Sequence, residues 1–218
     1  MEFRLIYEGS LKGSGNASKQ VKNKHSIRQQ IHKQLVELWK THPTLNQMNT
    51  FVRPPDPPPG EPLVGMKLSA AVRQGALGNH GLTYVQTIAN QFERCGFRFV
   101  PLVSKRLNAA CSLKILFLRR ENPGDLLTQS GDIDNRIKTL FDALRVPKDG
   151  SEIVGQPEEN ENPFFCLLED DCLVTDLSVT TDRLLTPLKE GQHKNEVVLI
   201  IQVKIKVVEL TGDNLLFL

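Results

Sequence analysis

Carboxylate side chains gather at two places in the sequence. The first is the segment 131–138, where Asp132 and Asp134 lie two residues apart and Lys138 follows four residues after the second aspartate. The second is the run 169–171, Glu-Asp-Asp. Mg²⁺ and Mn²⁺ prefer oxygen ligands, and Mg²⁺ usually keeps several waters, so a protein supplies only a few carboxylates and leaves other positions to a substrate phosphate. The two clusters therefore favour a metal-dependent phosphodiesterase that acts on nucleic acid.

Such a metal site would lower the pKa of a bound water, polarise the scissile phosphate and stabilise the leaving oxygen. We expect Asp132 and Asp134 to share a cation with Asp171 or its neighbour Asp170, although the two clusters are far apart in sequence. Lys138 falls one helical turn after Asp134, so its ammonium can point toward the same phosphate. The structural alternative is an Asp134–Lys138 surface ion pair worth roughly 0.3–0.5 kcal/mol, with Asp132 as a helix N-cap. For an Asp-x-Asp motif alone, this alternative is the commoner one.

The whole set of motifs resembles the RusA-type Holliday junction resolvases, which are homodimeric, magnesium-dependent endodeoxyribonucleases. The similarity covers 131–176 and includes Asp-Ile-Asp-Asn at 132–135, the lysine at 138, Asp-Ala-Leu at 142–144 and Asp-Asp at 170–171. The resemblance implies cleavage of a four-way DNA junction by a homodimer with Mg²⁺, for which Mn²⁺ could substitute. It implies that the catalytic, metal-binding carboxylates are Asp132, Asp134 and Asp171. It also implies that Lys138 is catalytic and that Asn135, Asp142 and Asp170 support these residues.

Basic residues are concentrated away from the carboxylates. Residues 1–40 contain eight Lys or Arg and three Glu, leaving a charge of +5, and residues 101–120 contain five Lys or Arg and no acid. Such patches gain affinity for DNA phosphates by releasing counterions. The alternative, a solvated charged surface, is the usual fate of charge runs. The candidate DNA-binding residues are Lys12, Lys19, Lys22, Lys24, Arg28, Lys105, Arg106, Arg119 and Arg120.

Hydrophobic periodicity predicts an α+β domain spanning 1–218, with a mixed β-sheet packed against two principal helices. The resemblance implies that this arrangement is RusA-like. We expect strands at 3–7, 97–103, 112–118, 172–185 and 196–210, and helices at 26–39, 84–92 and 133–144. Two segments look inserted relative to the resembled family: 42–95, with a proline-rich run, and the acidic loop 147–168. The acidic loop would repel a DNA arm or act as a gate, and the first insertion could cover the dimerisation surface.

Composition narrows the class of protein. A chain of 218 residues can grow one core; its 39% hydrophobic residues are a little under the typical value for a soluble domain, and its 24% charged residues are ordinary. The longest apolar runs are too short to cross a bilayer and no signal-peptide core is visible, so we expect a cytoplasmic protein with no membrane partner. The four cysteines form no Cys-x-x-Cys pair, which argues against structural zinc and favours reduced thiols.

Two other functions fit parts of the pattern. In a nucleotidyl- or glycosyltransferase, Asp-x-Asp would hold the diphosphate of an activated donor, but the chain has no convincing glycine loop for that donor. A nucleic-acid-binding or assembly protein could keep the fold without efficient catalysis. Metal-dependent nicking of branched DNA separates the nuclease from both.

Overall fold

The computed structural model describes residues 1–11, 17–50, 81–120, 133–187, 196–210 and 214. The main sheet has the strand order β1-β7-β4-β6. Strand β4 pairs antiparallel with β7 and parallel with β6, while β1 pairs antiparallel with β7, so the sheet is mixed. The α+β class with a mixed sheet is confirmed. The strands of this sheet are β1 (Glu2–Ser10), β4 (Ala109–Arg119), β6 (Val174–Arg183) and β7 (Glu196–Val207).

A second, smaller sheet has the order β2-β3-β5. Strand β3 (Phe97–Val103) pairs antiparallel with β2 (Glu93–Arg94) and parallel with β5 (Phe164–Leu168). The prediction for 97–103 was correct, whereas β5 lies inside the segment that we assigned to the acidic loop. All five residues of β5 are buried. A uniformly apolar run this short lacks the alternation that identifies a strand in a sequence.

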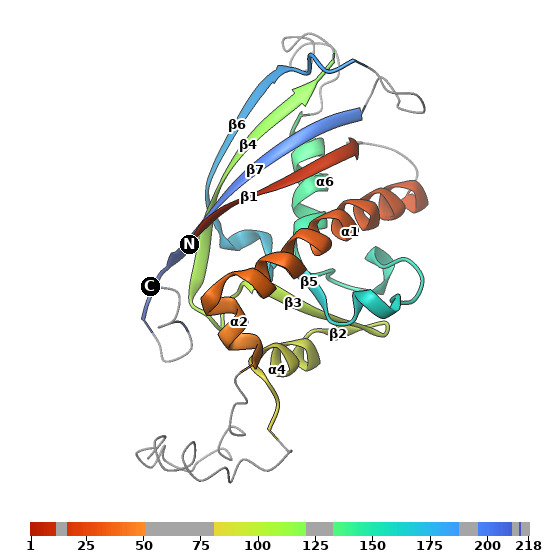
Figure 1. Cartoon of the computed structure of the whole chain (residues 1–218). Helices are drawn as coiled ribbons and strands as arrows, with labels where there is room; N and C mark the ends of the chain where they lie inside the picture. The colour runs from red at the N-terminus through yellow and green to blue at the C-terminus, as the bar shows by residue number, and fades with distance from the viewer. Residues whose placement is uncertain (12–16, 51–80, 121–132, 188–195, 211–213, 215–218) are drawn as a thin grey trace.

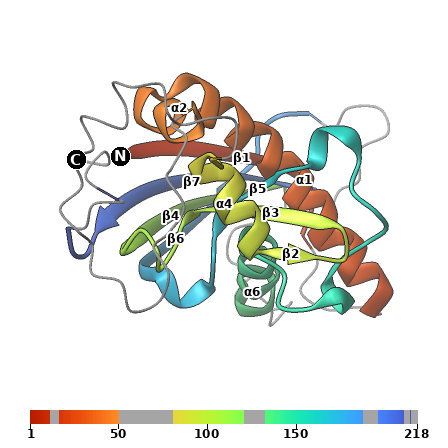
Figure 2. The ribbon, with the colours of Figure 1, turned by 90° about the horizontal axis from the view of Figure 1, so that it is seen from below.

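Four α-helices are present in the described residues, and the two principal helices predicted from the sequence are the longest of them. The two longest are α1 (Ala17–Thr41) and α6 (Ile133–Leu144), and Figure 1 shows them on the same side of the main sheet. The shorter two, α2 (Pro43–Thr50) and α4 (Tyr84–Gln91), fall within the predicted insertion but contribute buried side chains to the core. Figure 2 shows α4 lying against β3. Both ends of the predicted insertion thus contribute to the core, and its proline run lies outside the described residues.

The core is built by the periodicities that the sequence shows. On α1, Ile27, Ile31, Leu35 and Trp39 recur at intervals of four and are almost completely buried. On β7, alternate residues from 197 to 205 are buried under the helices, and those between them are partly or fully exposed. This stripe, which includes the only tryptophan of the chain, is part of the core. No helix in the described part of the chain is long and apolar enough to span a membrane.

Candidate functional site

The first carboxylate cluster lies at the start of α6. Asp134 is the second residue of this helix and Lys138 follows one turn later, and both side chains are exposed, as is Asn135. The opposite face of the helix is buried through Ile137 and Leu140. Asp134 and Lys138, both within the described residues, form no salt bridge with each other. The surface ion pair considered as an alternative is therefore absent, and both charges face solvent.

Asp132 lies outside the described residues, as does Lys12. The described part of the first cluster is thus one carboxylate, Asp134, with the lysine one turn away. A carboxylate in the first turn of a helix is favoured by the partial positive charge of the helix N-terminus. The side chains that the structure does describe at this point are compatible with a cation and a phosphate bound at the helix entrance.

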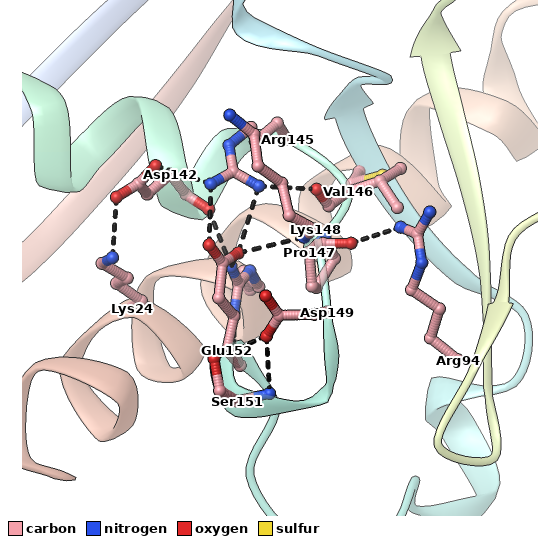
Figure 3. A network of polar contacts seen from close by, with 12 residues as sticks. Lys24, Arg94, Asp142, Arg145, Val146, Pro147, Lys148, Asp149, Ser151 and Glu152 are labelled. Carbon is pink, nitrogen blue, oxygen red and sulfur yellow. Dashed lines mark hydrogen bonds and ion pairs between the residues drawn. The ribbon is translucent and has the colours of Figure 1, made fainter. Parts of the chain in front are cut away.

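Asp142 occupies a different environment, although it belongs to the same helix. Its carboxylate pairs with the Lys24 ammonium at 2.7 Å and with the Arg145 guanidinium at 2.8 Å (Figure 3). Burial raises the pKa of the Asp142 carboxyl, but hydrogen bonds from Lys24 and Arg145 outweigh this effect and the net pKa is lowered. Asp142 therefore ties α6 to α1 rather than supporting Asp134.

The ion pairs of Asp142 extend into a buried network. Arg145 donates to both carboxylate oxygens of Glu152, at 2.8 and 3.1 Å. Arg28, only 3% exposed, donates to the backbone oxygens of Glu152 and Asp142, both at 2.7 Å. Burial lowers the pKa of Arg28 to about 10. We name the five residues Lys24, Arg28, Asp142, Arg145 and Glu152 the buried ion network.

This network corrects two of the predicted DNA contacts. The Lys24 ammonium is already paired with Asp142, and the Arg28 guanidinium is buried, so neither is a free surface cation in this structure. A run of basic residues in the sequence does not show which cations are paired with a carboxylate far along the chain and which are free at the surface. Lys24 and Asp142 are separated by 118 residues.

The second carboxylate cluster forms a tight turn before β6. Asp170 Oδ1 accepts a hydrogen bond from the backbone N–H of Cys172 at 3.0 Å and caps the short 3₁₀ turn Asp171–Leu173. This hydrogen bond lowers the pKa of Asp170 to about 2. Asp170 and Asp171 are both partly exposed.

The turn is fixed near the C-terminal end of α6. The backbone N–H of Val146, two residues after the helix, donates to Leu168 O at 2.9 Å, and Asp170 lines a cavity together with Val146 and Lys148. Asp134 lies at the other end of the helix. Eleven residues from Asp134 to Arg145 correspond to about 16 Å of helix at 1.5 Å per residue.

The expected convergence of Asp171 with Asp134 is therefore not seen. Within the described residues, no group of three or more His, Cys, Asp or Glu side chains is arranged to hold a metal ion. Helix α6 separates the two carboxylate clusters that the sequence pattern led us to combine. A motif fixes residue types and spacing, but the direction in which the chain returns after the helix depends on tertiary structure.

The remaining predicted DNA contacts are distributed over three places. Lys19 and Lys22 are exposed on the first half of α1. Lys105 is exposed and Arg106 partly buried in the turn before β4, whereas Arg119 and Arg120 lie at the far end of that strand, roughly 30 Å away at 3.3 Å per residue. Arg119 is only 6% exposed, which removes it from the candidate contacts. The basic segment 105–120 is thus not one continuous patch.

A cavity of about 260 Å³ lies beside the Asp170–Asp171 turn. Its wall includes two cations that the sequence analysis did not select, Arg94 and Lys148, together with Lys105. These residues come from segments far apart in the sequence, and no local motif marks Arg94 or Lys148. Only the pairing of β3 with β5, and the contact of β5 with the end of α6, brings them together.

Comparison with known proteins gives no relative: no family model, no curated protein and no solved structure matches this chain.

Proposed function

We propose that this protein is a metal-dependent endodeoxyribonuclease that hydrolyses phosphodiester bonds in branched DNA, with a four-way junction as the expected substrate. The observation that supports the proposal most directly is the exposed, mutually unpaired arrangement of Asp134 and Lys138 at the start of α6, directly after Asp132 in the sequence. The resemblance of the surrounding motifs to RusA-type resolvases supplies the reaction class. The proposal also includes DNA as the binding partner and a homodimer as the assembly.

The residues have distinct roles in this proposal. Asp132 and Asp134 hold Mg²⁺ through carboxylate oxygens, and the ion supplies an activated water and charge neutralisation at the phosphate. Lys138 directs its ammonium toward the scissile phosphate, where it stabilises the negative charge that develops on the leaving oxygen. Asn135 is exposed beside them and can orient a water or a phosphate oxygen through its amide.

Asp171 requires a separate test. The resemblance assigns it to the metal, whereas in this structure it follows the strand that adjoins the opposite end of α6. Two protein carboxylates are sufficient for a magnesium site because the ion keeps waters and takes substrate oxygens. Asp171→Asn distinguishes the two assignments: a loss of cleavage as large as that of Asp134→Asn would show that the two ends approach each other in the metal-loaded complex, and near-wild-type cleavage would exclude Asp171 from the site.

The separation of the two carboxylate clusters favours a second candidate function. In that case the protein binds nucleic acid, or helps to assemble a nucleic-acid complex, without cutting it. Exposed cations on α1 and in the turn before β4 are compatible with this function. Both candidates predict DNA binding, and only the first predicts nicking.

A substrate panel tests the proposal. Labelled four-way junction, fork, flap and linear duplex are incubated with the purified protein and Mg²⁺, Mn²⁺ or EDTA. We expect cleavage of the branched substrates with either metal and no cleavage in EDTA. Binding of branched DNA without nicking under either metal would overturn the nuclease proposal in favour of the second candidate.

A further inference from the structure

We propose that the cavity beside the Asp170–Asp171 turn binds one backbone phosphodiester of the DNA strand. We call it the phosphate pocket and define it by Phe92, Arg94, Lys105, Lys148, Glu169 and Asp170. The inference deepens the proposed function and rests on it, because it names a site at which the same substrate is held. The pocket lies at the opposite end of α6 from Asp134, so it is separate from the candidate metal site.

The carboxylates of the pocket are engaged with backbone amides. Glu169 Oε2 accepts a hydrogen bond from the backbone N–H of Lys105 at 2.8 Å, and Asp170 Oδ1 accepts one from Cys172. Their charges are thereby partly satisfied within the protein, since a carboxylate that accepts amide hydrogen bonds is stabilised in its ionised form.

The cations of the pocket are left with donors to spare. Arg94 Nη1 donates to the backbone oxygen of Pro147, which orients the guanidinium (Figure 3). Among the residues that the structure describes, the ammonium groups of Lys105 and Lys148 have no hydrogen-bond or salt-bridge partner. The three cations of the pocket therefore have N–H donors available for an anion.

The three cations are fixed by their backbones, although they come from three segments. Arg94 precedes a two-residue hairpin turn, Cys95-Gly96, in which both residues have positive φ, at 50° and 84°. The backbone N–H of Lys105 is bound by Glu169, and that of Lys148 donates to Glu152 Oε2 at 3.2 Å. The pocket is therefore a pre-arranged feature of the fold, and only the ends of the lysine side chains need to be ordered when an anion binds.

Charge and shape point to a diester of a nucleic-acid strand. Three cations against two carboxylates leave a charge of +1, which matches the single negative charge of a phosphodiester better than the nearly double charge of a free phosphate. Lys105 and Lys148 are exposed, so a continuous strand can enter. The partly exposed ring of Phe92 supplies an apolar surface for a deoxyribose or a base beside the phosphate.

Salt-dependent DNA binding tests the pocket without requiring cleavage. Binding of a fluorescent four-way junction is measured in EDTA at several salt concentrations for the wild type, Lys105→Gln, Lys148→Gln and the double variant. The matched control is Lys40→Gln, because Lys40 is an exposed lysine on α1 outside both sites. Each pocket variant should weaken binding about fivefold and reduce the slope of log K against log salt by about one, since one phosphate contact is lost.

A second measurement identifies the anion. Amide shifts of the ¹⁵N-labelled protein are followed on addition of a thymidine dinucleotide with one diester, or of inorganic phosphate. The pocket predicts shifts at Arg94, Lys105 and Lys148 with the dinucleotide at lower concentration than with inorganic phosphate. Tighter binding of inorganic phosphate would overturn the assignment to a DNA strand.

The possible failures are distinguishable. If the wild type nicks branched DNA with Mg²⁺ but the pocket variants retain the affinity and salt slope of the Lys40→Gln control, the pocket proposal is overturned and the nuclease proposal stands. If the pocket variants lose affinity and slope but the wild type never nicks DNA, the pocket stands and hydrolysis fails. If the wild type does not bind DNA at all, both are overturned.

Discussion

Asp134 and Asp142 lie eight residues apart on α6, and their surroundings differ in exposure and in ion pairing. Asp134 is exposed one turn from Lys138 and forms no ion pair with it, whereas Asp142 is held by two cations at 2.7 and 2.8 Å. A carboxylate whose oxygens are already paired is a poor metal ligand, because its partners must first be displaced. Exposure and pairing therefore favour Asp134 over Asp142 as the proposed metal ligand.

The pH dependence of stability should show the role of Asp142. Its pKa is lowered in the folded protein, so its contribution is present above the unfolded-state pKa of about 3.9 and is lost as pH falls through the folded-state value. The difference in free energy of unfolding between the wild type and Asp142→Asn should be largest at pH 7 and shrink as pH falls below about 4. Urea unfolding at pH 7, 4 and 3 measures this difference, and a constant difference across that range would contradict the assignment.

Loss of Arg145 should be costly because it leaves Glu152 without its two-pronged partner and leaves Lys24 as the one remaining ion-pair partner of Asp142 among the described residues. The Arg145 side chain is 3% exposed and bridges both residues. We expect Arg145→Met to lower the free energy of unfolding by about 3 kcal/mol. Lys40→Met is the control for replacing a surface cation and should change stability by less than about 0.5 kcal/mol. Equal stability of the two variants in urea would show that the buried ion network contributes nothing.

Residue types were predictable from the sequence, but their partners were not. Asp134 and Lys138 were selected correctly as neighbours on a helix because that relation depends only on a four-residue spacing. Lys24 and Arg28 were assigned to DNA because their partners, Asp142 and Glu152, are more than 100 residues away. Such pairings are set by the tertiary fold and leave no local pattern.

At the scale of elements, the sequence predicted well wherever one face of an element is buried. Apolar residues alternate along 196–207 and recur every four residues on α1, as expected for elements with one buried face, and the structure buries these residues. Strand β5 and helix α2 were missed. Strand β5 is buried throughout and shows no alternation, and α2 has only Leu45 and Met48 in the core.

Helix α1 should contribute strongly to stability through its buried stripe. Leu35 has no exposed surface and lies in the core between the helix and the sheets. We expect Leu35→Ala to destabilise the protein by about 2–5 kcal/mol through lost burial and a cavity. Glu37→Ala, on the exposed face of the same helix, is the matched control. Thermal unfolding compares them, and similar midpoints would argue against the packing of α1 described here.

At the scale of the whole molecule, α6 and β4 determine how far apart the charged groups lie. Helix α6 has Asp134 at one end and the phosphate pocket beyond the other, while β4 separates Lys105 from Arg120. A strand bound in the pocket and at Asp134 would run along α6. The sequence did not predict the distance between Asp134 and the Asp170–Asp171 turn, because that distance depends on how the chain returns after α6.

The proposed homodimer is tested by mass. Two equivalent sites related by a twofold axis would let one gene product cut both strands of a symmetric junction. Light scattering after size-exclusion chromatography should give twice the chain mass of 24.5 kDa. A mass equal to one chain, both alone and with junction DNA, would contradict the dimer.

The most direct test of the nuclease proposal is the single-turnover cleavage rate of a labelled four-way junction by Asp134→Asn compared with Asp182→Asn. Asp182 is an exposed aspartate on β6, outside both the candidate metal site and the phosphate pocket. We predict that Asp134→Asn loses more than about 100-fold in rate with Mg²⁺ while its DNA affinity is retained, and that Asp182→Asn cleaves like the wild type. Equal cleavage by the two variants would contradict the assignment of the chemistry to the start of α6.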